Sequence, residues 1–207
     1  MSTFGNSDLD NFEMDGSGFD EEATTPSAGG AACNKAGHYH VHVKDVKMEG
    51  AFEADAEGKW KSPCIRLDLE ILAGTEADQV GKTIYHRMYL RKKTMNGDKC
   101  VGLEPVTEES QNRILRAAYA LGLIDDDALG QKSVKVPWSQ SPGCQAIVKV
   151  DESEDEYNGK KTTNYRIEWG NLWRPDHEDV KEIPKDQEAL AMWGGGGSVS
   201  EDDIGDL

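Results

Sequence analysis

Apolar and polar residues alternate along several short stretches between residues 38 and 170, and this period of two is typical of half-buried β-strands. In the stretch 65–71, for example, isoleucine and leucine take one face, while Arg66, Asp68 and Glu70 take the other. The pattern predicts five strands, around residues 39–48, 65–71, 82–91, 144–150 and 161–169.

Two local signals add detail to this pattern. Val46 and Met48 are out of step with Val43, which predicts a β-bulge near Lys44–Asp45 and a sharp bend in the first strand. Thr107 is suited to begin a helix that ends near Gly122. Three strands, one helix and two strands predict a mainly β fold, a five-stranded OB-type barrel with its helix between strands 3 and 4. A half-open five-stranded sheet with a loosely packed helix is the alternative.

The net charge of −16 resides mainly at the ends of the chain. Residues 1–37 carry a net charge of −6 and residues 176–207 a net charge of −8, whereas residues 38–175 carry only −2. The ends also contain few large apolar residues, and such segments bury too little surface to fold. We therefore expect a disordered acidic segment at 1–37, an OB domain at 38–175 and an acidic tail at 176–207, with a glycine linker at 194–197.

The sequence offers little sign of a membrane, a metal or a catalytic site. No apolar run approaches the ~18 residues that a membrane span requires, and we expect a cytoplasmic protein. The four cysteines are widely spaced, which indicates free thiols. Motifs of nucleotide hydrolases, serine hydrolases and zinc proteases are missing, so we expect a protein that is not an enzyme and has no cofactor.

Stretch 82–91 is the best candidate for a binding surface. From Ile84 onward its even positions are apolar apart from His86, while its odd positions alternate aromatic and basic side chains. Residues 80–99 carry six Lys and Arg against Asp98 alone. Rings that stack on bases and cations that follow phosphates are what single-stranded nucleic acid requires. The predicted nucleic-acid-binding residues are Tyr85, Arg87, Tyr89, Arg91, Lys92 and Lys93, together with Trp60 and Lys61 from the first loop.

A different interpretation begins from His38, His40 and His42, which alternate along the first strand. Two histidines on one strand face are able to bind zinc. The only other histidines are His86 and His177, so an exposed strand face is the simpler interpretation and we expect no metal site.

Near the end of the chain, the four glycines of 194–197 are followed by an acidic tip with apolar residues. This arrangement resembles the tail of bacterial and phage single-stranded DNA-binding proteins, although this chain ends in leucine where the family ends in phenylalanine. The resemblance implies that the tip docks on replication and repair proteins. Its predicted partner-binding residues are Asp202, Asp203, Ile204, Asp206 and Leu207.

The body of the chain is also similar to a phage-encoded family of OB-fold single-stranded DNA-binding proteins. The shared segments are short but occur in the same order over about two-thirds of the chain. They are Gly37-His38-Tyr39, 67–71, Gly81-Lys82, Arg116-Ala117-Ala118 with Gly122, and 157–160.

Together these features predict a sequence-nonspecific single-stranded DNA-binding protein of phage or bacterial DNA replication, recombination or repair. An adaptor that binds replication or recombination proteins without touching DNA is the first alternative. A metal-dependent enzyme that uses His38, His40 and His42 is the second.

Overall fold

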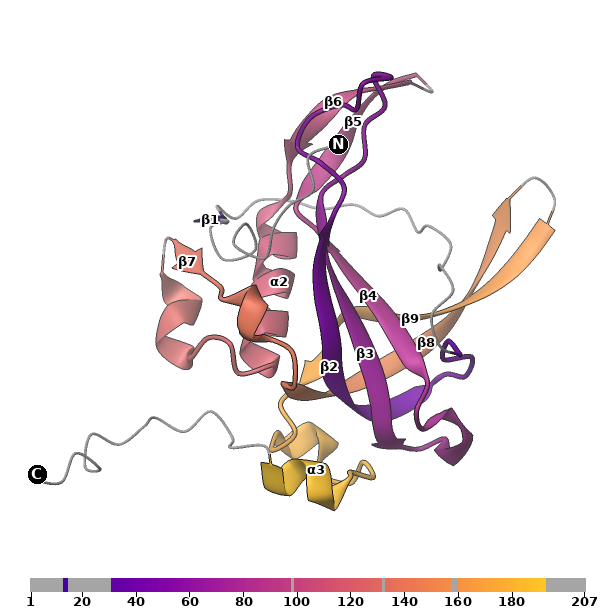
Figure 1. Cartoon of the computed structure of the whole chain (residues 1–207), viewed down its shortest axis with the longest axis vertical. Coiled ribbons are helices and arrows are strands. Elements are labelled where there is room, and N and C mark those ends of the chain that lie inside the picture. The colour runs from indigo at the N-terminus through magenta and orange to yellow at the C-terminus, as the bar shows by residue number, and fades with distance from the viewer. Residues whose placement is uncertain (1–12, 15–30, 98, 132, 158–159, 193–207) are drawn as a thin grey trace, which may run out of the picture.

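The structure, a computed structural model, describes residues 13–14, 31–97, 99–131, 133–157 and 160–192. Its main body is a five-stranded antiparallel sheet in the order β4-β3-β2-β8-β9, and a separate hairpin, β5–β6, projects from one end (Figure 1). The strands are β1 Glu13–Met14, β2 Gly37–Glu49, β3 Cys64–Gly74, β4 Thr83–Tyr89, β5 Arg91–Asn96, β6 Lys99–Pro105, β7 Val134–Lys135, β8 Gln145–Tyr157 and β9 Lys160–Trp173. The helices are α2 Glu108–Ala120 and α3 Gln187–Met192. The fold is mainly β, as the alternating sequence predicts.

Strand β2 is the centre of the sheet, because it pairs with β3 on one side and with β8 on the other. Strands β2, β3 and β4 follow one another along the chain, and β8 then returns to lie beside β2. The resulting order β8-β2-β3-β4 is that of a Greek key. The strand β9 extends this key by one antiparallel neighbour of β8.

The sheet does not close into the expected barrel. Within the described residues, no ladder joins the outer strands β4 and β9. At one end of β4 the edge is taken instead by residues 31–33: Cys33 N donates to Thr83 O at 3.0 Å, and Thr83 N donates to Ala31 O at 3.1 Å. Both hydrogen-bonding groups of Thr83 are therefore used by the chain that precedes β2. The architecture corresponds to the half-open sheet.

The predicted bulge in the first strand is confirmed. The register between β2 and β3 shifts between Val43 and Asp45, so Lys44 has no partner across the ladder. The ladder between β2 and β8 ends at His42. Val43 adds two backbone hydrogen bonds to the residues just before β8: its N donates to Cys144 O, and its O accepts from Gly143 N, both at 2.8 Å. Beyond the bulge, in the described structure, β2 continues to Glu49 with only β3 as its ladder partner.

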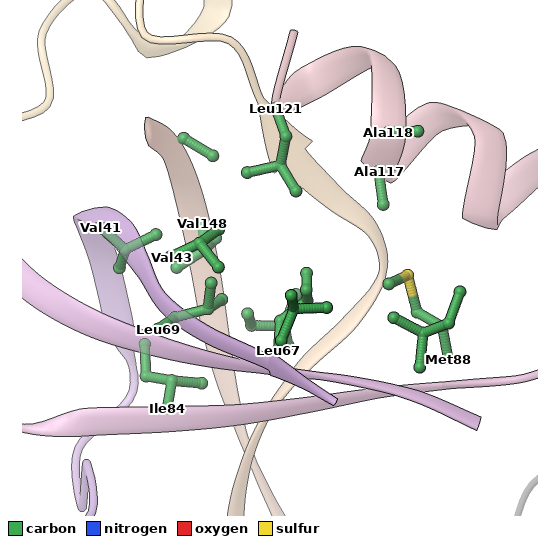
Figure 2. Packing of buried hydrophobic residues seen from close by; sticks show 14 of the residues in the cluster. Val41, Val43, Leu67, Leu69, Ile84, Met88, Ala117, Ala118, Leu121 and Val148 are labelled. Carbon is green, nitrogen blue, oxygen red and sulfur yellow. The ribbon is translucent and has the colours of Figure 1, made fainter. Parts of the chain in front are cut away.

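The core lies between the inner face of this sheet and α2. Figure 2 shows side chains of β2, β3, β4 and β8 in one cluster with Ala117 and Ala118 of the helix and with Leu121, which directly follows it. The small alanines allow a close approach of helix and sheet. The labelled residues are Val41, Val43, Leu67, Leu69, Ile84, Met88, Ala117, Ala118, Leu121 and Val148, and each is buried.

Helix α2 confirms the predicted helix between the third and fourth sheet strands. Thr107 precedes it, but its side chain makes no capping hydrogen bond. The helix ends in a Schellman motif, in which Leu123 N donates to Ala118 O and Gly122 N donates to Tyr119 O, both at 2.9 Å. Gly122 has φ of 71°, a conformation that favours glycine.

The segment predicted as one strand at 82–91 divides in two. Strand β4 ends at Tyr89, Leu90 is buried, and β5 begins at Arg91 in a different sheet. The hairpin β5–β6 was not expected, although Asn96-Gly97 is a turn dipeptide that marks it. Lys92 and Lys93 therefore do not extend the outer face of β4.

Packed structure extends beyond the predicted domain 38–175 on both sides. Cys33 is buried in the core before β2, and Val180 is buried after β9. The C-terminal segment is held by the fully buried His40, whose Nδ1 accepts from Asp186 N at 3.1 Å while its Nε2 lies 3.0 Å from Gln145 Oε1. The amide Nε2 of Gln145 donates in turn to Ala189 O at 2.8 Å.

His86 makes the stability of this fold sensitive to acid. It lies on the inner face of β4 opposite Leu67, and burial lowers its pKa to about 4. An unfolded chain has a histidine pKa near ~6.5, so stability is complete above that pH and is lost as the pH falls toward the folded pKa. Burial also lowers the pKa of His40, which acts in the same direction.

We predict that His86 alone reduces the free energy of unfolding by about 2 kcal/mol between pH 7.5 and pH 5. Urea unfolding at these two pH values measures the loss. The variant His86→Met, which keeps the core position apolar and of similar size, should lose that part of the pH dependence. A variant with the full wild-type pH dependence would contradict the assignment.

Candidate nucleic-acid interface

The outer face of β4 carries three of the predicted binding residues. Tyr85, Arg87 and Tyr89 are each half-buried and alternate with the buried residues Ile84, His86 and Met88. The alternation read from the sequence is therefore confirmed for β4. Arg87 lies directly opposite Arg66 of β3, a second outward-facing arginine that was not among the predicted residues.

A single carboxylate, that of Glu49, holds these two arginines together. Arg87 Nε donates to Glu49 Oε2 at 2.9 Å, and Arg66 Nη1 donates to Glu49 Oε1 at 2.7 Å. Arg66 also donates through Nε to Asp68 Oδ1 at 2.6 Å. Both guanidiniums are largely covered, with side-chain exposures of 11% for Arg66 and 19% for Arg87.

The network remains ionised at neutral pH. Burial raises the pKa of Glu49, but the hydrogen bonds from Arg66 and Arg87 outweigh burial, and the net pKa lies below its ordinary value. Lys47 lies beside the network, within 2.5 Å of Asp45. Lys47, Arg66 and Arg87 are thus matched by three carboxylates, those of Asp45, Glu49 and Asp68. These six residues together have no formal net charge.

Tyr85 is part of this network rather than a separate platform. The guanidinium carbon of Arg66 lies 4.6 Å from the centre of the Tyr85 ring, in cation–π contact. One face of the ring is therefore covered by an arginine that two carboxylates hold in place. This contact reduces the ring surface of Tyr85 that is open to a base.

All the remaining predicted cations except Lys61 lie on the β5–β6 hairpin, which we call the arm. Lys92, Lys93 and Lys99 are exposed there, and Arg91 stands at the base with its guanidinium 5.8 Å from the ring of Phe52. Lys92 lies 3.7 Å from Glu104 in an exposed pair, which contributes little binding energy.

The loop 50–63, which connects β2 to β3, contacts the chain where the arm begins. Pro63 O accepts from Leu90 N at 2.8 Å, just where the chain passes from β4 to the arm. Figure 1 shows this loop running beside the arm at the same end of the sheet. Trp60 is half-buried and Lys61 is exposed in it.

The structure thus brings the predicted residues to one end of the sheet, but divides them among three elements. Tyr85, Arg87 and Tyr89 lie on β4, whereas Arg91, Lys92 and Lys93 lie on the arm and Trp60 and Lys61 on the loop. The partner-binding residues Asp202, Asp203, Ile204, Asp206 and Leu207 lie outside the described residues.

The histidine strand does not form a converging ligand set. His40 is buried with both ring nitrogens directed at protein groups, while His38 lies against Trp173 and His42 faces Glu70. Across the described ranges, no group of three histidine, cysteine or acidic side chains is arranged to hold a metal ion. The four cysteines are unbridged.

No known family model matches the chain, and no curated protein matches it either. In the part of the chain that the structure describes, none of the helices is long and apolar enough to cross a membrane.

Glu49 should stabilise the fold through the two arginines. We predict that Glu49→Gln lowers the free energy of unfolding at pH 7 by about 1–2 kcal/mol, because it weakens charged hydrogen bonds between facing strands. Since the folded-state pKa of Glu49 is lowered, its contribution is present above the ordinary glutamate pKa and is lost as the pH falls through the folded value. The difference between variant and wild type should therefore shrink in acid. Urea unfolding measures this change in the free energy of unfolding. The control is Glu53→Gln, which removes an exposed carboxylate of the loop. Equal stability of the two variants would argue against the bridge.

Proposed function

We propose that the protein binds single-stranded DNA without sequence preference, in phage or bacterial DNA replication or recombination. The observation that carries the proposal is the gathering of four cations, three of them exposed, and two half-buried aromatic rings at one end of the sheet. Arg91, Lys92, Lys93 and Lys99 belong to the arm, and Trp60 and Tyr89 lie on the elements at its base. Cations for the phosphates and rings for the bases are the two components of a single-strand site.

The fold supports this proposal. A Greek-key sheet of five strands with a helix between the third and fourth follows the plan of an OB fold. OB folds bind oligonucleotides on the face of their second and third strands, and the loops beside that face contribute. Here those strands are β3 and β4, and the adjoining loop is 50–63. The resemblance to phage OB-fold proteins points to the same face.

We assign different roles to the sheet and to the arm. The arginines of the sheet are matched by carboxylates, so their main effect is to orient Tyr85 and stiffen the face. The lysines of the arm are exposed and contact the phosphates. Tyr89 and Trp60 stack on the bases.

The salt dependence of binding tests this division. If Arg91, Lys92, Lys93 and Lys99 neutralise about four phosphates, log K should fall against log[salt] with a slope of about −3. Replacing Lys92 and Lys93 by alanine should flatten the slope by about 1.4. Arg87→Gln is the matched control on the sheet and should change the slope little. Fluorescence titration with a labelled oligonucleotide measures all three proteins. If the wild-type protein does not bind the oligonucleotide, the proposed function is wrong and the adaptor function becomes the better hypothesis.

The tyrosines should contribute unequally. Tyr89→Ala is expected to weaken binding by about 1–3 kcal/mol, the range for one lost base stack. Tyr85→Ala should weaken it less, because Arg66 covers one face of that ring. The same titration ranks the two variants, and circular dichroism checks that both are folded. A larger effect at Tyr85 would place the base-stacking surface in the middle of β4 instead of at its end beside the arm.

We further propose that the C-terminal tip recruits replication or recombination proteins, as its resemblance to single-stranded DNA-binding tails implies. The support is the sequence, in which Ile204 and Leu207 stand among acidic residues. Pull-down from host lysate with the full chain and with Ile204→Ala/Leu207→Ala compares the captured partners. Identical partner sets would remove this role.

A further inference from the structure

The end of the arm carries exposed apolar side chains. Met95 is 53% exposed and Val101 is 49% exposed, on facing strands close to the turn. Lys93 and Lys99 lie beside them and are also exposed. Binding of phosphates by the lysines does not explain why aliphatic side chains are exposed beside them.

These two residues differ in chemistry from the rings at the base of the arm. Methionine and valine have no flat ring, so they offer no platform on which an unpaired base stacks. Aliphatic side chains instead serve DNA-binding proteins as wedges, which enter between neighbouring base pairs and unstack them. Such wedges act on paired DNA, where stacked steps are present.

The shape of the arm agrees with this use. It is a two-stranded ribbon that, within the described residues, pairs with no strand of the main sheet. Its base is fixed to the sheet by the Leu90–Pro63 hydrogen bond and by the contact of Arg91 with Phe52. Figure 1 shows the arm extending away from the sheet at its end.

The length of the arm sets how far it reaches. The six residues of β5 extend about 20 Å at ~3.3 Å per residue. This equals the rise of about six nucleotides at ~3.4 Å each. A protein bound to a single strand through the base of the arm therefore places Met95 and Val101 several nucleotides farther along.

We propose that the arm recognises the junction between single- and double-stranded DNA and unstacks the first base pairs of the duplex with Met95 and Val101. The proposal rests on single-strand binding by the base of the arm. Lys92, Lys93 and Lys99 keep their contacts with the phosphates of the single strand up to the junction, while the apolar pair enters the stack of the first base pairs. The ligand is thus a fork rather than a single strand alone.

The test compares a forked duplex with the single strand that forms its tail. Fluorescence titration gives the two affinities, and 2-aminopurine placed at each of the first duplex positions reports unstacking. The variants are Met95→Gln/Val101→Thr, which keep size and strand preference while adding polarity. Val80→Thr is the matched control, because Val80 is 50% exposed but lies outside the arm.

Wild type and Val80→Thr should bind the fork about fivefold or more tighter than the tail and raise the 2-aminopurine signal near the junction. The double variant should lose this preference and the signal, while binding the single strand like the wild type. Equal affinity of the wild-type protein for fork and tail, or an unchanged preference in the double variant, would overturn the wedge. Loss of binding to the single strand in the wild-type protein would instead refute the proposed function itself.

Discussion

Strand β2 has two neighbours along its first half and one along its second, and the rest of the architecture depends on this change. The bulge at Lys44 marks the point, because the β8 ladder has ended and only the β3 ladder continues to Glu49. A bulge bends a strand and increases its twist. The second half of β2 is thereby free of β8, so that Glu49, the loop 50–63 and the arm gather at one end of the sheet.

The Glu49 bridge explains why an outward-facing pair of arginines is not simply a phosphate site. Arg66 and Arg87 are directly opposite on neighbouring strands, where like charges repel. One carboxylate shared between them removes this repulsion and fixes both side chains. The exposed cations at this end of the molecule are therefore the lysines of the arm rather than the arginines of the sheet.

The sequence predicted the strands whose apolar residues alternate regularly, because the core accepts only one face of each strand. It also predicted the bulge at Lys44, where the phase slips. The break at Leu90 was missed, since Leu90 continues the apolar phase of β4 and only the pairing partner changes. The sequence predicted a closed sheet, but the described strands do not close. The prediction failed because no local pattern indicates that residues 31–33 pair with Thr83. The bridge formed by Glu49 was also not predicted, because its two partners, Arg66 and Arg87, lie on other strands and far away in the sequence.

The arrangement of charge is compatible with the DNA-binding site that we propose in an acidic chain. His40 and Gln145 hold the C-terminal segment, with its exposed acids Glu178, Asp179 and Glu182, at the end of β2 away from the arm (Figure 1). From His40 to Glu49 the strand extends about 30 Å at ~3.3 Å per residue. The Debye length is only ~8 Å at physiological ionic strength, so these acids scarcely weaken the potential at the arm. The buried contacts of His40 and Gln145 therefore keep these three acids away from the cations of the arm.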